Sequence, residues 1–375
     1  MRRLLPLLCG LLLAACGQRA ARPIGDFTLP VYTPRYASGF EITGAAGSRS
    51  TLVTVHNPWY GDEVTDQYLF IARDGEPAPA GFEGQVLRDE ARRVVCMSGS
   101  YIAMLDALGA ADRVVGVSGA QYLINETLRR RIARGEAADV GFDSNVDFER
   151  LMALRPDLVM LFGIGGADTA LTGKLRELGI PYLYMGEHCE ESPLGKSEWV
   201  VVAAEIAGLR TEGSRLFAAI PERYERLRAL AQQTAARPRV MLNTPYRDTW
   251  FMPARNSYMV RLLEDAGARY VFEENTATQT LPIDIEQAYY LTSKSDFWLN
   301  VSGCNTLDEV RRQNPRLADT PPVREGRVYD NNRRRNAAGG SDFWESGVLR
   351  PDRVLADLVH IFHPELSETD ELYYY

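Results

Sequence analysis

Strand-like and helix-like spacings of apolar residues alternate along most of the chain. Each apolar run that predicts a strand is followed by a turn and a helical pattern, such as Ile102, Leu105 and Leu108 after the first run. The predicted strands cover residues 94–97, 114–117, 158–162, 182–185 and 239–243. Strands that alternate with helices are typical of a parallel sheet covered by helices. The predicted fold class is therefore α/β.

A long helical segment interrupts this alternation near the middle of the chain. Residues 198–236 have helical spacing with almost no strand pattern, and Gly208 breaks them. The piece over 211–236 is amphipathic and charged, with Pro221 inside it. We expect this piece to be one long rigid linker helix between two α/β units.

The two units resemble copies of each other. The residues LDALGA at 105–110 correspond to LEDAGA at 263–268, and both follow a predicted strand and helix. Glu149 in the first unit and Glu286 in the second each precede a leucine at the same spacing. Internal duplication predicts two similar Rossmann-like lobes, each with a central parallel sheet, that face each other.

The first residues indicate export from the cytoplasm. Arg2 and Arg3 precede an apolar run over 4–13, which is too short to span a bilayer as a helix. The run leads through small residues to Cys16 and resembles a bacterial lipoprotein signal, in which cleavage leaves Cys16 as the lipidated first residue. A plain secretory signal is the alternative. We expect a protein of the periplasm or cell envelope that is anchored to the membrane by lipid.

A β-rich stretch separates this anchor from the first lobe. The runs at 51–56 and 67–72 predict an antiparallel pair of strands. The predicted organisation is a signal peptide over 1–15, a tether over 16–36, a β-rich extension over 37–90, an N-terminal lobe over 91–210, a linker helix over 211–236, a C-terminal lobe over 237–366 and a tail over 367–375.

Composition and cysteine content exclude some classes of partner. The 375 residues are 45% hydrophobic and 25% charged, the balance of an ordinary globular protein. A net charge of -8 argues against nucleic acid as a partner, because phosphate binding requires a clustered positive surface. Beyond the signal and Cys16, the chain has Cys96, Cys189 and Cys304, and no pair has metal-ligand spacing. We expect buried thiols or one disulfide, and no metal site.

The residues that enzymes use for catalysis do not form a set in this sequence. His360 and His363 lie near the end of a predicted helix, where a positive charge is stabilised by the helix dipole. His188 and Cys189 are adjacent in an extended segment, so their side chains are expected to point in opposite directions. Residues 116–119 lack the second glycine of a nucleophile elbow. We therefore predict that the protein is not an enzyme and carries no cofactor.

Aromatic and arginine residues gather instead on the loops predicted to follow strands. Ligands of open α/β sheets bind at the carboxyl ends of strands. Arginine captures carboxylates or phosphates, and aromatic rings supply flat apolar area, so a bulky anionic or metal-chelate ligand is expected. A solvated turn is an equally weighted explanation of the arginine run. The candidate ligand-binding residues are Tyr101, Tyr122, Tyr246, Arg247, Trp250, Arg333, Arg334, Arg335 and Trp344.

One segment carries a family resemblance. Residues 147–159 contain the pattern Glu-x-Leu-x-x-Leu-x-Pro-Asp-Leu-Val, which begins at Glu149. With the lipoprotein start, the linker helix and the twin segment at Glu286, residues 91–363 resemble the periplasmic substrate-binding proteins of ABC importers for ferric siderophores, heme and cobalamin. The resemblance implies two lobes joined by one rigid helix, a ligand between them, and docking to the permease through Glu149 and Glu286.

The sequence also departs from this family. A common Thr-Glu pair is replaced by Ile102-Ala103, and residues 37–90 are extra. The resemblance implies a monomeric binding protein that captures a ferric siderophore or cobalamin, with heme as the alternative ligand. Two other classes remain open: an extracytoplasmic hydrolase around Ser98, Ser100 or Ser118, and a sensor lipoprotein that works without a permease.

Overall fold

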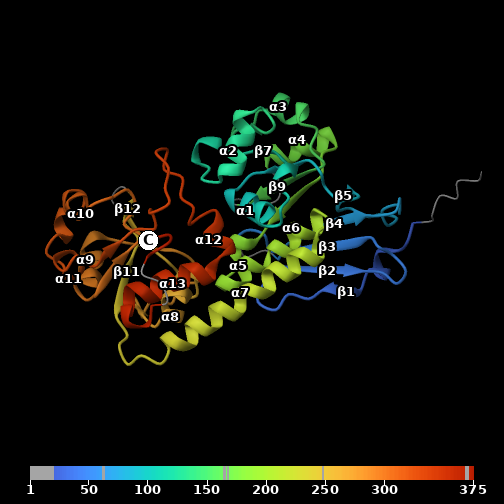
Figure 1. Ribbon diagram of the computed structural model, residues 1–375. Helices are drawn as coiled ribbons and strands as arrows, with labels where there is room; N and C mark the ends of the chain where they lie inside the picture. The colour runs from blue at the N-terminus through green and yellow to red at the C-terminus, as the bar shows by residue number, and fades with distance from the viewer. Residues whose placement is uncertain (1–20, 61–63, 164–165, 167–168, 247–248, 368–370) are drawn as a thin grey trace, which may run out of the picture.

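A computed structural model describes residues 21–375 except 61–63, 164–165, 167–168, 247–248 and 368–370. The protein has two α/β lobes and an N-terminal sheet that packs against the first lobe (Figure 1). The predicted α/β fold class with two lobes is confirmed. Cys16 and Arg247, which the sequence singled out, lie outside the described residues.

The first lobe is built on a parallel sheet in the order β10-β9-β6-β7-β8. Its apolar runs are buried on both faces, as expected for parallel strands covered by helices. Three of the predicted strands coincide with the observed bounds. The strands are β6 (Val94–Cys96), β7 (Val114–Val117), β8 (Ala138–Asp139), β9 (Leu158–Phe162) and β10 (Tyr182–Met185), and the helices between them are α1 (Gly99–Ala107), α2 (Glu126–Ala133), α3 (Phe148–Ala153) and α4 (Ala170–Leu178).

The second lobe has a four-stranded parallel sheet in the order β14-β11-β16-β17 and a small antiparallel sheet in the order β12-β13-β15. The parallel strands are β11 (Arg239–Leu242), β14 (Arg269–Tyr270), β16 (Phe297–Leu299) and β17 (Val328–Tyr329). The antiparallel strands are β12 (Pro245–Tyr246), β13 (Thr249–Met252) and β15 (Leu281–Ile283). The helices are α8 (Tyr258–Asp265), α9 (Ile285–Ser293), α10 (Leu307–Gln313), α11 (Pro321–Arg324), α12 (Ser346–Leu349) and α13 (Pro351–Phe362).

The helix α7 (Arg210–Ala231) joins the lobes and runs beneath both in Figure 1. Its 22 residues span about 33 Å at 1.5 Å per residue. It follows α5 (Pro193–Glu198) and α6 (Val200–Ile206), and it packs against α6 on one side and α13 on the other. Pro221 lies inside α7, buried, as the sequence placed it. Among the described residues, no helix has the length and apolar character needed to cross a bilayer.

The repeated sequence segments adopt the same local structure in both lobes. Gly109 and Gly267 end α1 and α8 with φ of 71° and 79°, a conformation that glycine adopts without strain. Asp157 precedes β9 in the first lobe, and its carboxylate accepts the backbone N–H of Arg93, next to the neighbouring strand, at 2.9 Å. Asp296 precedes β16 in the second lobe, and its carboxylate likewise accepts a backbone N–H at the start of the neighbouring strand. The internal duplication predicted from short sequence matches is therefore visible as repeated geometry.

The N-terminal sheet has the order β1-β2-β3-β4-β5. Its strands are β1 (Leu29–Tyr32), β2 (Phe40–Gly44), β3 (Thr51–His56), β4 (Asp66–Ala72) and β5 (Gln85–Arg88). The predicted antiparallel pair is present as β3 and β4. The sequence assigned residues 16–36 to a tether, but within that range Leu29–Tyr32 is paired with β2. The ordered sheet thus begins inside the segment predicted as a tether.

Three buried glutamates attach this sheet to the first lobe. Glu198 accepts the Tyr32 hydroxyl at 2.7 Å and the backbone N–H groups of residues 35–37 at 2.7 to 2.8 Å. Glu190 accepts the backbone N–H of Gly39 at 2.9 Å, and Glu205 forms an ion pair with Arg73 at 2.9 Å. Because these carboxylates are buried, their partners in the sheet are needed to satisfy them. The sheet is therefore an integral part of the first lobe.

The C-terminal residues are also packed into the fold. Tyr374 and Tyr375 are buried, although the sequence assigned them to a tail. The Asp357 carboxylate on α13 accepts the backbone N–H groups of residues 373, 374 and 375 at 2.8, 2.6 and 3.3 Å. The hydroxyl of Tyr374 lies 2.9 Å from that of Ser346 on α12. These contacts place Tyr374 and Tyr375 in the core of the second lobe, with Tyr373 partly buried beside them.

Candidate functional site

Loops at the carboxyl ends of the two parallel sheets meet between the lobes. The loop after β7 contacts the segment after β17, because the Asn336 amide donates to the carbonyl oxygens of Gln121 at 2.9 Å and Leu123 at 3.1 Å. The residues after β13 contact the loop after β10, because the Asn256 amide donates to the Glu191 carboxylate. Ligands of α/β sheets bind at this end of the strands, so the site between the lobes is framed by these loops.

Residues 336–345 form a strut from the second lobe to the first, and α12 continues it between the lobes (Figure 1). The Glu345 carboxylate accepts the backbone N–H of Ile124 at 2.6 Å and of Asn125 at 2.9 Å. Burial raises the pKa of Glu345 to about 7, although these two hydrogen bonds oppose the shift. Gly340 lies so close to Tyr122 that a Cβ atom would be 1.6 Å from its carbonyl oxygen. The strut is thus fitted to the first lobe by hydrogen bonds and by shape.

The predicted ligand residues Tyr122 and Trp344 are exposed on these loops, and Tyr246 is exposed on β12. Tyr246 ends β12 and is 66% exposed. The Tyr122 ring lies 6.3 Å from the ring of Phe142, between centroids, and both belong to loops of the first lobe. Exposed aromatic rings on loops between two lobes offer flat apolar area to a ligand.

Two predicted ligand residues are core residues instead. Tyr101 on α1 is 0% exposed, and its hydroxyl donates to the carbonyl oxygen of Leu161 at 3.2 Å. Trp250 on β13 is 1% exposed and packs against Trp298 at 5.6 Å between centroids. Successive side chains of a strand point to opposite faces, so burying Trp250 turns Phe251 outward. The prediction that Tyr101 and Trp250 contact ligand is therefore wrong.

The arginine run at 333–335 is exposed, but only part of it is free to contact a ligand. Arg334 forms an ion pair with Asp342 at 2.7 Å and lies over the Tyr373 ring at 4.5 Å. Arg333 lies 3.7 Å from Glu371. Arg335 forms no ion pair with another residue that the structure describes. Arg334 thus holds the strut to the second lobe, and Arg335 is the member of the run best placed for an anion.

Glu149 and Glu286 occupy equivalent positions in the two lobes. Each is the second residue of a short helix, α3 or α9, and each is exposed. The preceding Asp147 and Asp284 cap these helices by accepting backbone N–H groups. Glu286 lies 3.6 Å from the exposed Arg316. The geometry presents one carboxylate on each lobe to solvent, while docking to a permease stays a prediction.

His188 contributes a ring rather than a metal ligand to the first lobe. Its Nε2 lies 2.8 Å from the carbonyl oxygen of Gly163, and its Nδ1 is buried without a partner among the described residues. Burial and the nearby Lys196 lower the pKa of His188 to about 4, so the imidazole is neutral at physiological pH. The ring lies 4.3 Å from that of Phe162, between centroids.

Other polar side chains near the site are engaged within the fold. Ser98 caps α1, and the Ser100 hydroxyl donates to Glu187 at 2.9 Å. No histidine is hydrogen-bonded to Ser98, Ser100 or Ser118 in the part of the chain that the structure describes, so the geometry gives no support to a hydrolase. The thiols of Cys96, Cys189 and Cys304 are free. The described side chains form no cluster of three or more potential metal ligands.

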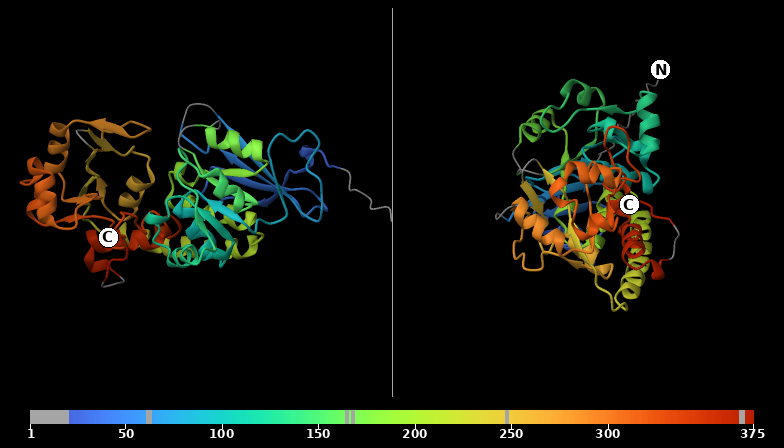
Figure 2. Two further views of the ribbon diagram at one scale, coloured as in Figure 1. Left: turned by 90° about the horizontal axis from the view of Figure 1, so that it is seen from above. Right: turned by 90° about the vertical axis from the view of Figure 1, so that its left-hand side faces the viewer.

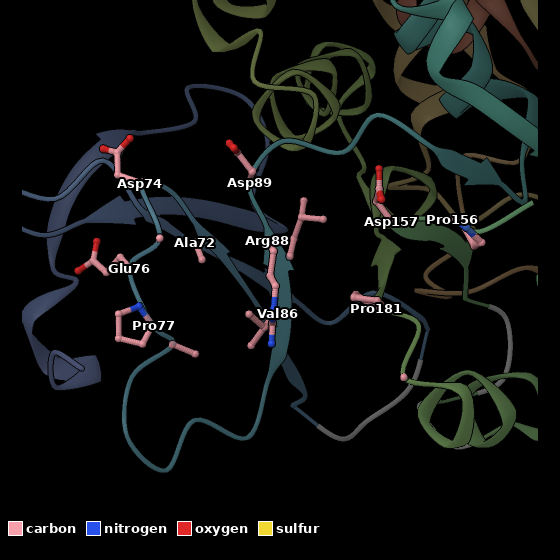
Figure 3. Close-up of a pocket in the computed structure, with 14 residues that line it drawn as sticks. Ala72, Asp74, Glu76, Pro77, Val86, Arg88, Asp89, Pro156, Asp157 and Pro181 are labelled. Atoms are coloured by element: carbon pink, nitrogen blue, oxygen red, sulfur yellow. The ribbon is translucent and has the colours of Figure 1, made fainter. Parts of the chain in front are cut away.

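A large cavity lies elsewhere, between the N-terminal sheet and the first lobe. It has a volume of about 930 Å³, and Asp74, Arg88 and Asp157 are among its lining residues (Figure 3). Asp157 precedes β9, so this cavity is at the amino ends of the strands. It is therefore separate from the loops at the carboxyl ends where the lobes meet.

Tyr60 is an exposed aromatic residue near His188 that the sequence pattern did not single out. It lies between β3 and β4, outside the region of the family resemblance, and is 64% exposed. Its hydroxyl donates to the carbonyl oxygen of His188 at 2.7 Å. The adjacent aromatic residues Trp59 and Tyr60 in a predicted turn were the available signal.

This architecture defines a class: two-lobed binding proteins whose lobes are joined by a single long helix and hold ligand between them. A model of the periplasmic binding protein family matches residues 94–333. The chain belongs to this family, which confirms the resemblance drawn from the sequence and the predicted location in the periplasm or cell envelope.

Several known proteins are similar to this chain. The uncharacterized lipoprotein MJ0878 of Methanocaldococcus jannaschii is 25% identical over 332 residues, covering 82% of this chain and 77% of that protein. The apo periplasmic heme-binding protein RhuT of Roseiflexus sp. RS-1 has a TM-score of 0.58 and 21% identity, covering 74% of this chain and all of that one. A protein of an Fe3+-hydroxamate transport system from Saccharomonospora viridis has a TM-score of 0.55 and 17% identity, covering 73% of this chain and 94% of that one. These structures share the fold.

Proposed function

We propose that this protein is the substrate-binding lipoprotein of an ABC importer and captures an iron chelate between its lobes. The observation that carries the proposal is the convergence of loops from the carboxyl ends of both sheets, which display the exposed aromatic rings of Tyr122 and Trp344. The family consists of binding proteins, and similar folds belong to proteins whose names state heme or Fe3+-hydroxamate. The chain's own role is to bind and deliver.

The ligand is proposed to be a ferric siderophore or heme, with cobalamin as the alternative. Arg335 favours an anionic chelate, because a guanidinium pairs with carboxylates in a bidentate manner. Both nitrogens of His188 are turned into the protein. Tyrosine is therefore the residue type that the described loops offer as an axial ligand to a heme iron.

Delivery is proposed to use the two exposed carboxylates and the membrane anchor. Glu149 and Glu286 lie on the two lobes at equivalent positions, so a permease with two basic sites would contact both lobes at once. Lipid on Cys16 would keep the protein near that permease. Because α7 and the strut both connect the lobes, closure around the ligand is expected to be small.

Titration of the purified protein tests the proposal. Hemin, ferrioxamine B and cyanocobalamin are added separately, and quenching of tryptophan fluorescence is measured, since the exposed Trp344 lies on the strut between the lobes. We expect micromolar or tighter binding of one of the two iron compounds. Absence of such binding by all three compounds contradicts the proposed function.

A further inference from the structure

Residues 57–60, which follow β3 of the N-terminal sheet, lie on the carboxyl ends of β9 and β10. Gly163 follows β9, and a Cβ atom there would be 2.8 Å from the carbonyl oxygen of Pro58. Gly186 follows β10, and its Cβ position is 3.4 Å from the Cα of Pro58. Glycine at both positions allows this close approach. The N-terminal sheet thus reaches the end of the first lobe at which ligands bind.

Residues 57–60 are held in place by hydrogen bonds between Asn57 and Thr65 and by one aromatic contact. The backbone N–H of Asn57 donates to the carbonyl oxygen of Thr65 at 2.8 Å, and the backbone N–H of Thr65 donates to the Asn57 side chain at 2.9 Å. Trp59 packs edge-on against Tyr184 of β10, with ring centroids 5.3 Å apart. These contacts make residues 57–60 part of the first lobe's surface.

Tyr60 is held at the side of the first lobe that faces the second. Its ring lies edge-on to the ring of His188 at 6.0 Å between centroids, and its hydroxyl donates to the carbonyl oxygen of His188. Tyr258, the first residue of α8 in the second lobe, has a pKa raised by burial and by the nearby Tyr60. The view from above shows β3 and β4 reaching the edge of the first lobe that faces the second (Figure 2). Tyr60 therefore borders the space between the lobes.

We propose that Tyr60 is a ligand-contact residue, so that the N-terminal sheet contributes one wall of the site between the lobes. This inference rests on the proposed function and adds to it a residue outside the region 94–333 that the family model matches. Tyr60 is 64% exposed, so its ring offers a flat apolar surface to a flat or apolar part of the ligand. Burial and the nearby Cys189, Glu187 and Glu191 raise the pKa of Tyr60 to about 12, so its phenol stays protonated at neutral pH. Tyr60 thus acts through its ring and not as a phenolate ligand to iron.

The test compares Tyr60→Ala and Tyr60→Phe with the unaltered protein. Each is titrated with hemin, ferrioxamine B and cyanocobalamin, and the dissociation constant is taken for the compound that the unaltered protein binds most tightly. We expect binding to be weakened about tenfold by Tyr60→Ala, because an aromatic contact is lost, and less than about threefold by Tyr60→Phe. The absorption spectrum of the bound iron compound should be the same for Tyr60→Phe as for the unaltered protein.

Tyr68→Ala is the matched control, because Tyr68 is 41% exposed on β4 of the same sheet and its hydroxyl donates to Asp66 of that strand. It should bind as the unaltered protein does, and thermal unfolding of all variants checks that they are folded. Equal binding by Tyr60→Ala and the unaltered protein overturns the inference and leaves the proposed function standing. Equal losses in Tyr60→Phe and Tyr60→Ala also overturn it, because the ring would not be the contact. Failure of the unaltered protein to bind any of the three compounds contradicts the proposed function itself.

Discussion

The carboxylate of Glu345 in the second lobe accepts the backbone N–H of Asn125 in the first lobe at 2.9 Å. The same carboxylate accepts the neighbouring backbone N–H of Ile124, so one buried side chain satisfies two donors across the lobes. The sequence distance between these residues is more than 200 positions. The bond makes the strut a connection between the lobes in addition to α7.

Glu345 and Glu187 should each lower the free energy of unfolding as the pH rises from 4.5 to 7, while His188, whose pKa is lowered to about 4, contributes in the opposite direction. Burial raises the pKa of Glu345 from 4.5 to about 7, and that of the buried Glu187 likewise to about 7. In this pH window the two carboxyl groups are protonated in the folded state and ionised in the unfolded state, so raising the pH favours unfolding. Each group lowers the free energy of unfolding by about 3 kcal/mol across the window. Glu345→Gln cannot titrate and should show a smaller decrease in urea unfolding measured across this window.

The remaining decrease in Glu345→Gln should come in part from Glu187, because its pKa is raised in the same direction. Glu126→Gln is a control, since Glu126 is an exposed residue of α2 whose side chain is 81% exposed. It should have the pH dependence of the unaltered protein. An unchanged slope in Glu345→Gln would contradict the assignment of this titration to the contact between the lobes.

Gly340→Ala should release the strut from the first lobe. The added Cβ would lie 1.6 Å from the carbonyl oxygen of Tyr122, so the two backbones must separate. The hydrogen bonds of Asn336 and Glu345 would then be lost, at a cost of about 2 to 4 kcal/mol in the free energy of unfolding. Urea unfolding measures this cost, and small-angle X-ray scattering should report an increased radius of gyration.

Gly173→Ala tests whether this effect is specific to the strut. Gly173 lies within α4, and a Cβ atom there would meet no atom within 4 Å. Alanine favours a helix more than glycine, so this variant should be unchanged or more stable by up to about 1 kcal/mol. A loss of stability in Gly340→Ala no larger than that in Gly173→Ala would show that the close approach to Tyr122 is not maintained.

Glu198→Ala should loosen the N-terminal sheet from the first lobe. It removes the acceptor for the Tyr32 hydroxyl and for three backbone N–H groups, which leaves them unpaired in a partly buried place. We expect a loss of about 3 kcal/mol or more in the free energy of unfolding, with faster proteolysis near residues 29–40. Glu222→Ala, at an exposed position of α7, should change neither quantity. Equal stability of the two variants would refute the anchoring role of Glu198.

Reversing the charge of both Glu149 and Glu286 to lysine should abolish uptake and leave ligand affinity within about twofold. The two carboxylates are exposed on separate lobes, and truncating or reversing a charge at an interface slows association and removes ion pairs. Uptake of radiolabelled iron by cells that carry the cognate permease provides the measurement. Reversal of the exposed Glu126 and Glu325 should leave uptake intact. Normal uptake by the Glu149 and Glu286 double variant would refute the docking role.

Local pattern was sufficient to predict much of the fold. The strands at 114–117, 158–162 and 182–185 were predicted with the observed bounds, because buried parallel strands are continuous apolar runs between turns. The linker helix was predicted over 211–236 and observed as Arg210–Ala231. These features depend on residues that are neighbours in the chain.

The candidate site was harder to predict, since it depends on which loops meet. Trp250 and Phe251 are adjacent aromatic residues, and only the packing of β13 on the second lobe buries the first and exposes the second. Tyr60 could not be assigned to the site from sequence, because its contact with His188 joins residues 128 positions apart.

The sequence by itself determined the α/β class, the duplicated lobes, the helix between them and the family resemblance. These follow from periodicity and repeated short motifs, which local backbone preference and burial impose on neighbouring residues. The tertiary structure alone decided that Glu190, Glu198 and Glu205 hold the N-terminal sheet, and that Glu345 joins the lobes. A buried carboxylate needs hydrogen-bond donors, and here the donors come from distant parts of the chain. No local sequence pattern predicts which donors the folded chain brings to it.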